Sequence, residues 1–291
     1  MTQAPFPYFG GKASVADANG DKSIRGIAMI TDATFMRGSI VDEAITRLRG
    51  YEDLALALSP DGYFLAFSGG KDSIVLHDLA VRSGVKFTAH FQWTTIDPPE
   101  VLRFIRANYP QVIWSRPAKS MFQLISSWGP PTMWARWCCS ELKEGAGIGR
   151  MVTMGLRWEE SPKRGKRRMY ESCMRSGRRL FLNPIIDWTT EDVWAYIRAR
   201  TLAYPCLYDE GFKRVGCVMC PLKSRRERER DAARWPAFNR MYLLAFQQLL
   251  DSGKRDEMDW KTPADVMEWW LQDPPDKGED TETQSLFGEE A

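Results

Sequence analysis

Short apolar runs alternate with stretches of helical periodicity along much of the chain. Buried strands are predicted at residues 63–67, 85–91, 112–114 and 151–156. Helices are predicted at residues 40–58, 74–82, 98–108, 119–127 and 134–145, where apolar side chains recur at helical spacing. Strands that alternate with helices predict an α/β fold, in which a doubly wound, mostly parallel sheet lies between two helical layers.

The remainder of the chain predicts a loop and a set of helices. Residues 157–179 are strongly basic and predict a loop, and a capping box at Thr189 and Asp192 predicts the start of a further helix. A basic helix and then an apolar helix are expected within 222–250, and a Trp-rich helix near 263–271. We therefore expect a flexible leader (1–37), an α/β domain (38–221), a small helical C-terminal extension (222–272) and a disordered acidic tail (273–291).

Composition and charge are those of an ordinary globular protein. The 291 residues are 44% hydrophobic and 27% charged, and the net charge of +2 gives no argument for nucleic-acid binding by itself. No apolar run approaches the roughly 20 residues that a membrane helix needs, and the N-terminus shows no secretory pattern. We expect a cytoplasmic protein without a membrane partner, in which the six cysteines bind metal or act in catalysis.

Six consecutive residues, Ser68-Gly69-Gly70-Lys71-Asp72-Ser73, join the first predicted strand to the next helix. Glycines allow a tight turn close to an anion, and the first N–H groups of the helix point toward it. Lys71 adds a positive charge, and Ser68 and Ser73 can donate hydroxyl hydrogen bonds. Asp72 does not suit a simple anion cradle, which suggests a magnesium ion or water nearby. The motif predicts a phosphate-binding loop, although its glycine-to-lysine spacing is too short for the Walker pattern.

Further candidate residues follow other strands of the predicted sheet. Thr94 and Asp97 come after the second strand, and Gly155 and Arg157 lie at the end of the strand at 151–156. Because ligands bind at the carboxyl ends of parallel strands, we expect these residues beside the phosphate loop. The basic loop at 157–179 has two interpretations: a solvated charged face, or a cover over a bound polyanion.

The cysteines form a scattered but suggestive set: Cys138, Cys139, Cys173, Cys206, Cys217 and Cys220. A Cys-x-x-Cys spacing such as Cys217–Cys220 brings two thiolates onto one metal or cluster, and distant cysteines must complete the site. Adjacent cysteines fit a zinc ribbon poorly, and Gly216 and Pro221 fit a thioredoxin-like redox pair poorly. The residues therefore favour an iron–sulfur cluster over zinc, which stays the alternative.

Several motifs occur in a fixed order and together resemble a known family. They are Ser68–Ser73, Thr94–Glu100, Trp137–Lys143, Gly155–Ser161, Asn183–Trp194 and Leu207–Pro221. The Ser68–Ser73 motif resembles the PP-loop of the ATP pyrophosphatase superfamily, and the whole set resembles the phosphoadenosine phosphosulfate (PAPS) reductase family in its phage and mobile-element form. The resemblance covers roughly residues 60–222 and implies a bound adenine nucleotide, either ATP or a sulfonucleotide (PAPS or its adenylylsulfate counterpart, APS).

This resemblance also implies residue roles. Residues Ser68, Gly69, Gly70, Lys71, Asp72 and Ser73 would hold phosphates and Mg²⁺, with Thr94, Asp97, Gly155 and Arg157 completing the nucleotide site. Lys71, Asp72 and Arg157 would serve catalysis. The adjacent pair with Cys217 and Cys220 resembles the 4Fe–4S ligands of assimilatory APS reductases, whereas Cys138 with Cys206, Cys217 and Cys220 resembles those of a DNA phosphorothioation sulfurtransferase. Which four of the five cysteines are ligands stays open.

Three functions follow from these features. The first is an enzyme that cleaves ATP to AMP and pyrophosphate and uses a 4Fe–4S cluster in sulfur transfer to a nucleic acid or small molecule. The second is a sulfonucleotide reductase; its family uses a catalytic cysteine near the C-terminus, yet no cysteine follows Cys220, so Cys173 would have to replace it. The third is a nucleotide-binding accessory protein with a structural metal site, whose basic helix at 223–234 docks a partner.

Overall fold

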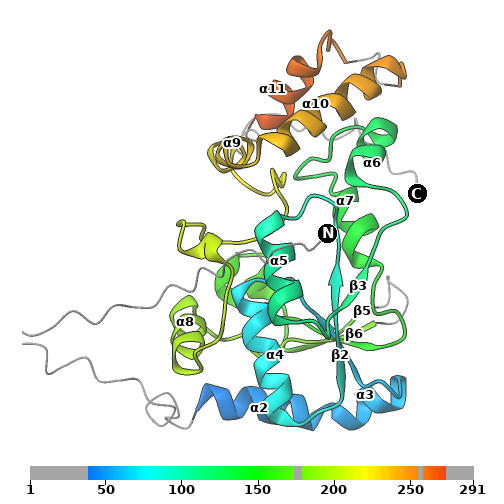
Figure 1. Ribbon diagram of the computed structural model, residues 1–291. Helices are drawn as coiled ribbons and strands as arrows, with labels where there is room; N and C mark the ends of the chain where they lie inside the picture. Colours follow the sequence, from blue (N-terminus) through cyan, green and yellow to red (C-terminus); the bar gives the residue numbers. More distant parts are fainter. Residues whose placement is uncertain (1–38, 174–178, 255–257, 273–291) are drawn as a thin grey trace, which may run out of the picture.

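A six-stranded sheet organises the molecule (Figure 1). The computed structural model describes residues 39–173, 179–254 and 258–272, so the expected leader and acidic tail lie outside the described residues. The strands are β1 (Tyr63–Ala66), β2 (Phe87–Gln92), β3 (Ile113–Ser115), β4 (Met151–Thr153), β5 (Tyr170–Cys173) and β6 (Arg179–Leu182). Their order is β3-β2-β1-β4-β6-β5, and within the described sheet every pairing except β5 with β6 is parallel. The predicted doubly wound, mostly parallel α/β architecture is confirmed.

Helices cover the sheet and connect its strands. They are α2 (Ile40–Gly50), α3 (Glu52–Leu58), α4 (Lys71–Ser83), α5 (Pro99–Asn108), α6 (Met121–Trp128), α7 (Trp137–Cys139) and α8 (Thr190–Ala199). Helix α4 packs between α2 and α8, and the Tyr63 hydroxyl of β1 donates a hydrogen bond to the Leu48 carbonyl of α2 at 2.6 Å. On β1 and β2, Phe64 and His90 stack with their ring centroids 4.1 Å apart. None of the described helices is both long and apolar enough to cross a membrane.

Three local predictions were wrong. The expected helix at 40–58 is two helices, because the chain leaves helical geometry at Tyr51 (φ −112°, ψ 6°), whose ring stacks on Tyr170 of β5. The expected helix at 134–145 is only α7 followed by a π-helical turn at Ser140–Glu144. The basic loop at 157–179 contains strand β5, which pairs with β6 at the sheet edge, as well as short 3₁₀ turns at Trp158–Glu160 and Arg164–Lys166.

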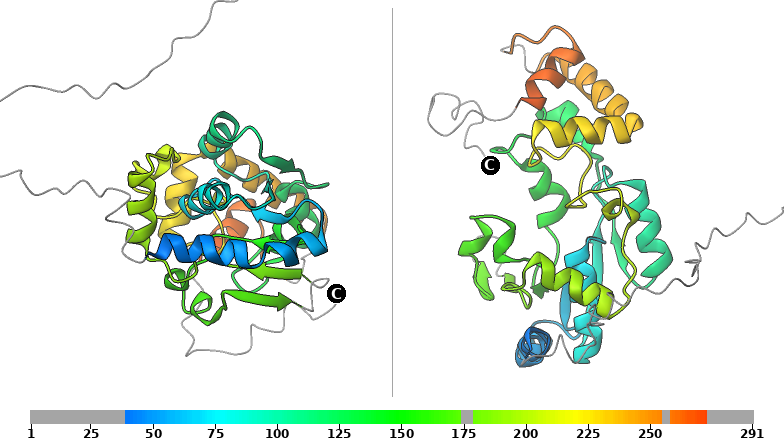
Figure 2. Two further views of the ribbon diagram at one scale, coloured as in Figure 1. Left: turned by 90° about the horizontal axis from the view of Figure 1, so that it is seen from below. Right: turned by 90° about the vertical axis from the view of Figure 1, so that its left-hand side faces the viewer.

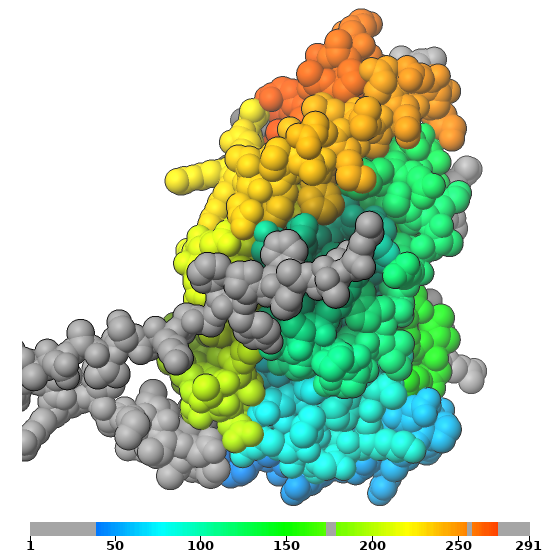
Figure 3. All heavy atoms as spheres, in the orientation of Figure 1, coloured from blue at the N-terminus to red at the C-terminus, as the bar shows by residue number. Residues whose placement is uncertain are grey.

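The C-terminal region is helical and packs on α6. It contains α9 (Arg225–Arg234), α10 (Pro236–Asp251) and α11 (Pro263–Leu271). Tyr242 of α10 lies between Phe122 of α6 and Trp270 of α11, and the Trp270 indole donates to the Pro131 carbonyl at 2.6 Å. These helices lie at the end of the molecule opposite α2 and α3 (Figure 2), and they form a continuous surface with the neighbouring segments (Figure 3).

Four arginines of α9 bond to other parts of the described chain: Arg225, Arg228, Arg230 and Arg234. Buried Arg228 donates to the carbonyls of Trp270 and Leu271 at the end of α11. Arg234 pairs with Glu100 and Glu210, which belong to the α/β domain. The basic helix therefore holds the C-terminal region against the rest of the chain, which weakens the argument that its charge docks a partner.

Candidate functional site

The phosphate loop adopts the predicted strand–turn–helix geometry at the carboxyl end of β1. Gly69 has φ +72°, and a Cβ there would lie 2.9 Å from Ile105, so the turn needs glycine for both conformation and space. Gly70 is the N-cap of α4, and the first helical hydrogen bond runs from the Ile74 N–H to the Gly70 carbonyl. The N–H groups of Lys71 and the two residues after it precede that ladder, as an anion site at a helix N-terminus requires.

Both serine hydroxyls of the motif brace the loop. Ser73 Oγ donates to the Gly70 carbonyl at 2.8 Å and accepts the Ser68 N–H at 3.2 Å. Ser68 Oγ donates to Ser73 Oγ at 3.2 Å and accepts the Gly70 N–H at 3.3 Å. In this arrangement the serines shape the cradle, and the backbone and Lys71 supply its donors.

Lys71, Asp72 and Arg157 form one buried charge network. Asp72 accepts from Lys71 Nζ at 3.0 Å and from Arg157 Nε at 2.7 Å. The Arg157 side chain is only 2% exposed. Its remaining nitrogens donate to Glu159, the Trp188 carbonyl and Thr190. Because protein groups occupy each guanidinium nitrogen, Arg157 holds Asp72 in place and presents no unengaged nitrogen to a ligand.

The other predicted nucleotide-site residues make structural contacts that the sequence did not reveal: Gly155, Thr94 and Asp97. A Cβ on Gly155 would be 2.7 Å from the Asp72 carbonyl oxygen, so glycine permits the strand end to approach α4. Asp97 accepts the Thr94 N–H at 2.7 Å and the Thr94 hydroxyl at 2.8 Å, which closes a buried turn after β2. Burial raises the pKa of Asp97, and the nearby charge of Lys143 opposes that shift.

Sequence reasoning missed a residue that touches the loop directly. The Tyr208 hydroxyl accepts the Lys71 N–H at 2.9 Å, although the two residues are far apart in the chain. Tyr208 ends a 3₁₀ turn (Cys206–Tyr208) and packs edge-to-face on Trp194 of α8. Its position within the Leu207–Pro221 motif was the available signal, but an aromatic residue in a loop does not by itself predict contact with a phosphate loop.

Four of the cysteines gather in one neighbourhood beside this loop. Cys138 donates a thiol hydrogen bond to Cys139, which raises the pKa of Cys138 and lowers the pKa of Cys139. Cys217 and Cys220 interact electrostatically with Cys138, and burial raises the pKa of Cys220. Cys206 is exposed and interacts instead with Arg234. We call Cys138, Cys139, Cys217 and Cys220 the thiol group.

The turn that carries Cys217 and Cys220 is held by other elements. Val218 donates its N–H to the Ile96 carbonyl at 2.8 Å, and its own carbonyl accepts from the Tyr242 hydroxyl at 3.1 Å. Met219 has φ +54°, and its N–H donates to Asp231 of α9 at 2.7 Å. Asp231 and Tyr242 were also missed, because nothing in their local sequence links them to the cysteines.

The thiol group fits an iron–sulfur cluster in kind. Within the described ranges, no three His, Cys, Asp or Glu side chains already form a metal-holding group. The donors themselves are four free thiols with mutual electrostatic contacts, which is the ligand chemistry of such clusters. Lys143 is solvent-exposed but faces Cys217, and this contact raises the pKa of Lys143. A positive charge there suits a group of thiolates.

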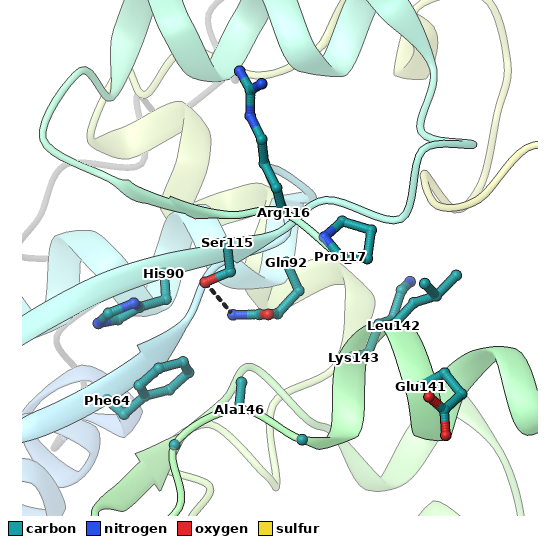
Figure 4. A pocket seen from close by; sticks show the side chains of 12 residues that line it. Phe64, His90, Gln92, Ser115, Arg116, Pro117, Glu141, Leu142, Lys143 and Ala146 are labelled. Atoms are coloured by element: carbon teal, nitrogen blue, oxygen red, sulfur yellow. Dashed lines mark hydrogen bonds between the residues drawn. The ribbon is translucent and has the colours of Figure 1, made fainter. Parts of the chain in front are cut away.

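A cavity of about 400 Å³ is lined by residues of β1, β2 and β3 and by the segment that follows the cysteine pair. Figure 4 shows Phe64 and His90 side by side at one end and Gln92 bonded to Ser115 in the middle. Arg116 points away from the space (Figure 4), toward Trp93, over whose ring its guanidinium lies. The cavity is therefore lined mainly by neutral groups, and the phosphate loop does not contribute to it.

These features define a class: an α/β protein with a phosphate-binding loop and a thiol group at the same edge of its sheet. Comparison with known proteins gives the family. Residues 62–223 match the family described as phosphoadenosine phosphosulfate reductase domain. This match covers more than half of the 291 residues, and the chain belongs to that family.

Individual relatives cover only parts of the chain. A phosphoadenosine 5′-phosphosulfate reductase of Gloeobacter violaceus is 32% identical over 170 residues, which is 54% of this chain and 70% of that protein. An uncharacterised protein of Methanocaldococcus jannaschii is 32% identical over 166 residues, which is 54% of this chain and 40% of that protein. The chain thus spans less than half of the length of the two uncharacterised M. jannaschii proteins that it matches.

Two solved structures show weaker likeness. The chain is similar to a Candida auris PAPS reductase in a phosphate complex, with 21% identity, a TM-score of 0.45, and coverage of 60% of this chain and 88% of that one. It is also similar to an FMN adenylyltransferase of Candida glabrata, with 15% identity, a TM-score of 0.48, and coverage of 70% and 76%.

Proposed function

We propose that this protein is an enzyme that binds ATP at the phosphate loop, cleaves it to AMP and pyrophosphate, and couples that cleavage to sulfur transfer. The observation that carries the proposal is the adjacency of the two centres. Tyr208 contacts the phosphate loop, and Cys217, in the same segment, lies 3.5 Å from the Thr94 hydroxyl at the end of β2. An activated nucleotide and a sulfur-bearing group would therefore meet at one sheet edge.

The phosphate loop would act as an electrostatic clamp. Its backbone N–H groups and Lys71 would hold phosphate oxygens and stabilise the charge that develops as pyrophosphate leaves. A bound phosphate competes with Asp72 for Lys71, and the released Asp72 oxygen suits a Mg²⁺ ion. Arg157 would keep Asp72 oriented, because Glu159 and Thr190 hold its guanidinium in place.

The thiol group would hold a 4Fe–4S cluster through Cys138, Cys139, Cys217 and Cys220. The mutual interactions of these thiols support that set over the alternative with Cys206. When bound, the cluster would supply a site for binding or delivering sulfur. Lys143 would offset its negative charge, and zinc is the alternative occupant.

A second candidate is sulfonucleotide reduction, which the names of the Gloeobacter relative and of an adenosine 5′-phosphosulfate reductase of Lysinibacillus sphaericus favour. In that reaction a cysteine thiolate attacks the sulfur of the sulfonucleotide, the nucleoside phosphate leaves, and a thiosulfonate forms on the protein. A second thiol then releases sulfite as a disulfide forms. The relocated thiol proposed from sequence, Cys173, ends β5, and its side chain lies outside the described residues.

Anaerobic calorimetry with ATP, APS and PAPS, each with Mg²⁺, separates these candidates. Preference for ATP together with pyrophosphate release supports the first, and preference for a sulfonucleotide with sulfite release supports the second. Tight binding without turnover under any condition favours the accessory role. Lys71→Ala should weaken binding about 10- to 100-fold through loss of a charged hydrogen bond, whereas Lys86→Ala, on the exposed surface, serves as the control.

The acceptor of the sulfur is proposed only by class, as a nucleic acid or a small molecule. A search for it follows once the nucleotide is known. The phage and mobile-element origin and the cytoplasmic location also stay predictions.

A further inference from the structure

Tyr208 occupies a place that a phosphate oxygen would need. Its phenolic oxygen accepts the Lys71 N–H at the first turn of α4. In a phosphate loop, this kind of N–H group is the donor that faces the bound anion. The phenol therefore imitates a ligand oxygen at the centre of the candidate site.

The surrounding packing is built to bring the phenol there. Gly70 has no side chain, and a Cβ at that position would lie 3.3 Å from the Tyr208 hydroxyl and 4.0 Å from the Val215 carbonyl. The ring packs against Trp194 and Tyr204, with centroid distances of 5.1 Å and 6.3 Å. The packing of the ring and the missing side chain at Gly70 thus both allow the hydroxyl to reach the Lys71 N–H.

We propose that Tyr208 is a gate on the phosphate loop: its hydroxyl caps the Lys71 N–H until a phosphoryl oxygen displaces it. The proposal rests on the proposed function in one respect, that the loop takes a phosphate-bearing ligand. A phosphoryl oxygen makes a charge-assisted bond to the N–H, which is stronger than the bond to a neutral phenol. An uncharged nucleoside has no such oxygen and leaves the gate in place.

A gate of this kind determines which ligands bind. The protein selects for phosphate-bearing compounds twice, first through the charge of Lys71 and again through the need to displace Tyr208. The Arg214 charge interacts with Tyr208, and Arg214 is exposed, so an approaching anion meets a positive charge beside the gate.

Removing the Tyr208 hydroxyl tests the gate, because the proposal predicts tighter and not weaker binding of phosphate-bearing ligands. Tyr208→Phe keeps the ring packing and removes the competitor, so the full-length protein should bind inorganic pyrophosphate and ATP about 3- to 10-fold more tightly. Adenosine binding should not change. Tyr204→Phe is the matched control, because it removes a neighbouring hydroxyl that bonds to Asp209 and not to the loop. Equal or weaker pyrophosphate binding in Tyr208→Phe, or no pyrophosphate binding by either protein, overturns the gate.

Hydrogen exchange of the ligand-free proteins gives an independent measurement. The Lys71 amide should exchange faster in Tyr208→Phe than in the parent or in Tyr204→Phe, because its acceptor is gone. Unchanged exchange contradicts the contact. Failure of the proposed function is a different result: phosphate ligands open the gate, yet neither nucleotide cleavage nor sulfite release follows.

Discussion

The phosphate loop and the thiol group lie at the same edge of the sheet, but they are built in different ways. The loop consists of consecutive residues, Ser68–Ser73, whose hydroxyl and backbone groups bond mainly to one another. The thiol group joins α7 to a turn much later in the chain, and that turn depends on Ile96, Asp231 and Tyr242.

This difference shows that different hydrogen bonds hold the two centres in their conformations. The loop keeps its shape through local bonds, so damage to the C-terminal helices should leave it largely intact. The turn at Cys217–Cys220 is held by hydrogen bonds to Asp231 of α9 and Tyr242 of α10, so it should lose its conformation when either helix is disturbed. Selective damage to one centre is therefore the way to test the comparison.

The largest effect is expected on metal content. Cys217→Ser should abolish iron binding in anaerobically reconstituted protein, because it removes one member of the thiol group. Cys206→Ser should retain iron, since Cys206 is exposed and lies beside Arg234. Iron and sulfide analysis with visible absorption measures both variants, and equal loss of iron would return Cys206 to the ligand set.

Next in size is the loss of Asp231, whose side chain is 1% exposed and bonds to the Met219 N–H and to Lys223. Asp231→Ala should cost about 2–4 kcal/mol of unfolding free energy, because it leaves the buried Met219 N–H without an acceptor and the half-buried Lys223 without its carboxylate partner. Urea denaturation measures the change, with Glu229→Ala on the exposed side of α9 as control. The comparison fails if folded Asp231→Ala protein loses phosphate binding as completely as it loses iron.

A smaller change is expected from Arg157→Lys, which damages the other centre. Lysine cannot reproduce the contacts to Asp72, Glu159 and Thr190 together, so about 1.5–3 kcal/mol of stability should be lost. Nucleotide affinity should fall while iron content stays unchanged. Arg164→Lys in the same loop should change neither the nucleotide affinity nor the iron content. Reduced affinity at unchanged stability would mean that Arg157 touches the ligand directly.

The smallest effect is a pH dependence of stability that arises from two histidines, the buried His77 of α4 and the half-buried His90 of β2. Burial lowers the pKa values of His77 and His90 below the ordinary value of 6.5, so both are neutral in the folded protein at higher pH. The unfolded chain takes up protons as pH falls below 6.5 while the folded protein resists, and stability is lost by up to about 1.4 kcal/mol per pH unit per histidine. Urea midpoints at pH 7.5, 6.5 and 5.5 should therefore decrease, and His77→Gln should reduce the slope. A midpoint that rises toward pH 5.5 contradicts this account.

The sheet and the phosphate loop could be predicted because their signals are local. An apolar run of strand length, two glycines and a lysine sit next to one another, so sequence order is also spatial order. The break at Tyr51 was missed, because the helical pattern continues through it and the stacking on Tyr170 is a tertiary contact. Strand β5 was missed because charged residues dominate its surroundings.

The other contacts of the candidate site could not be predicted from the sequence, because they join residues that are far apart in the chain. The sequence predicts that Gly155 binds the nucleotide, whereas in the structure the closest neighbour of a Cβ at Gly155 is the backbone of Asp72. The sequence predicts a role for the charge of Arg157, and in the structure Asp72, Glu159 and the Trp188 carbonyl accept its hydrogen bonds. Asp231 and Tyr242 have no local signal, and the motif that contains Tyr208 does not indicate its contact with Lys71, since each of the three acts on a segment that is distant in sequence.

One stretch of chain, residues 204–220, touches both centres, and its length has a consequence of its own. In the ligand-free protein the Tyr208 hydroxyl bonds to the phosphate loop, and the Val218 N–H bonds to the Ile96 carbonyl. Side chains between these anchors, such as exposed Lys213, can be exchanged without moving either end. An insertion or deletion of one residue would shift one centre relative to the other, although it would leave every reactive group in the sequence. The number of residues in this stretch is therefore under tighter constraint than most of their identities.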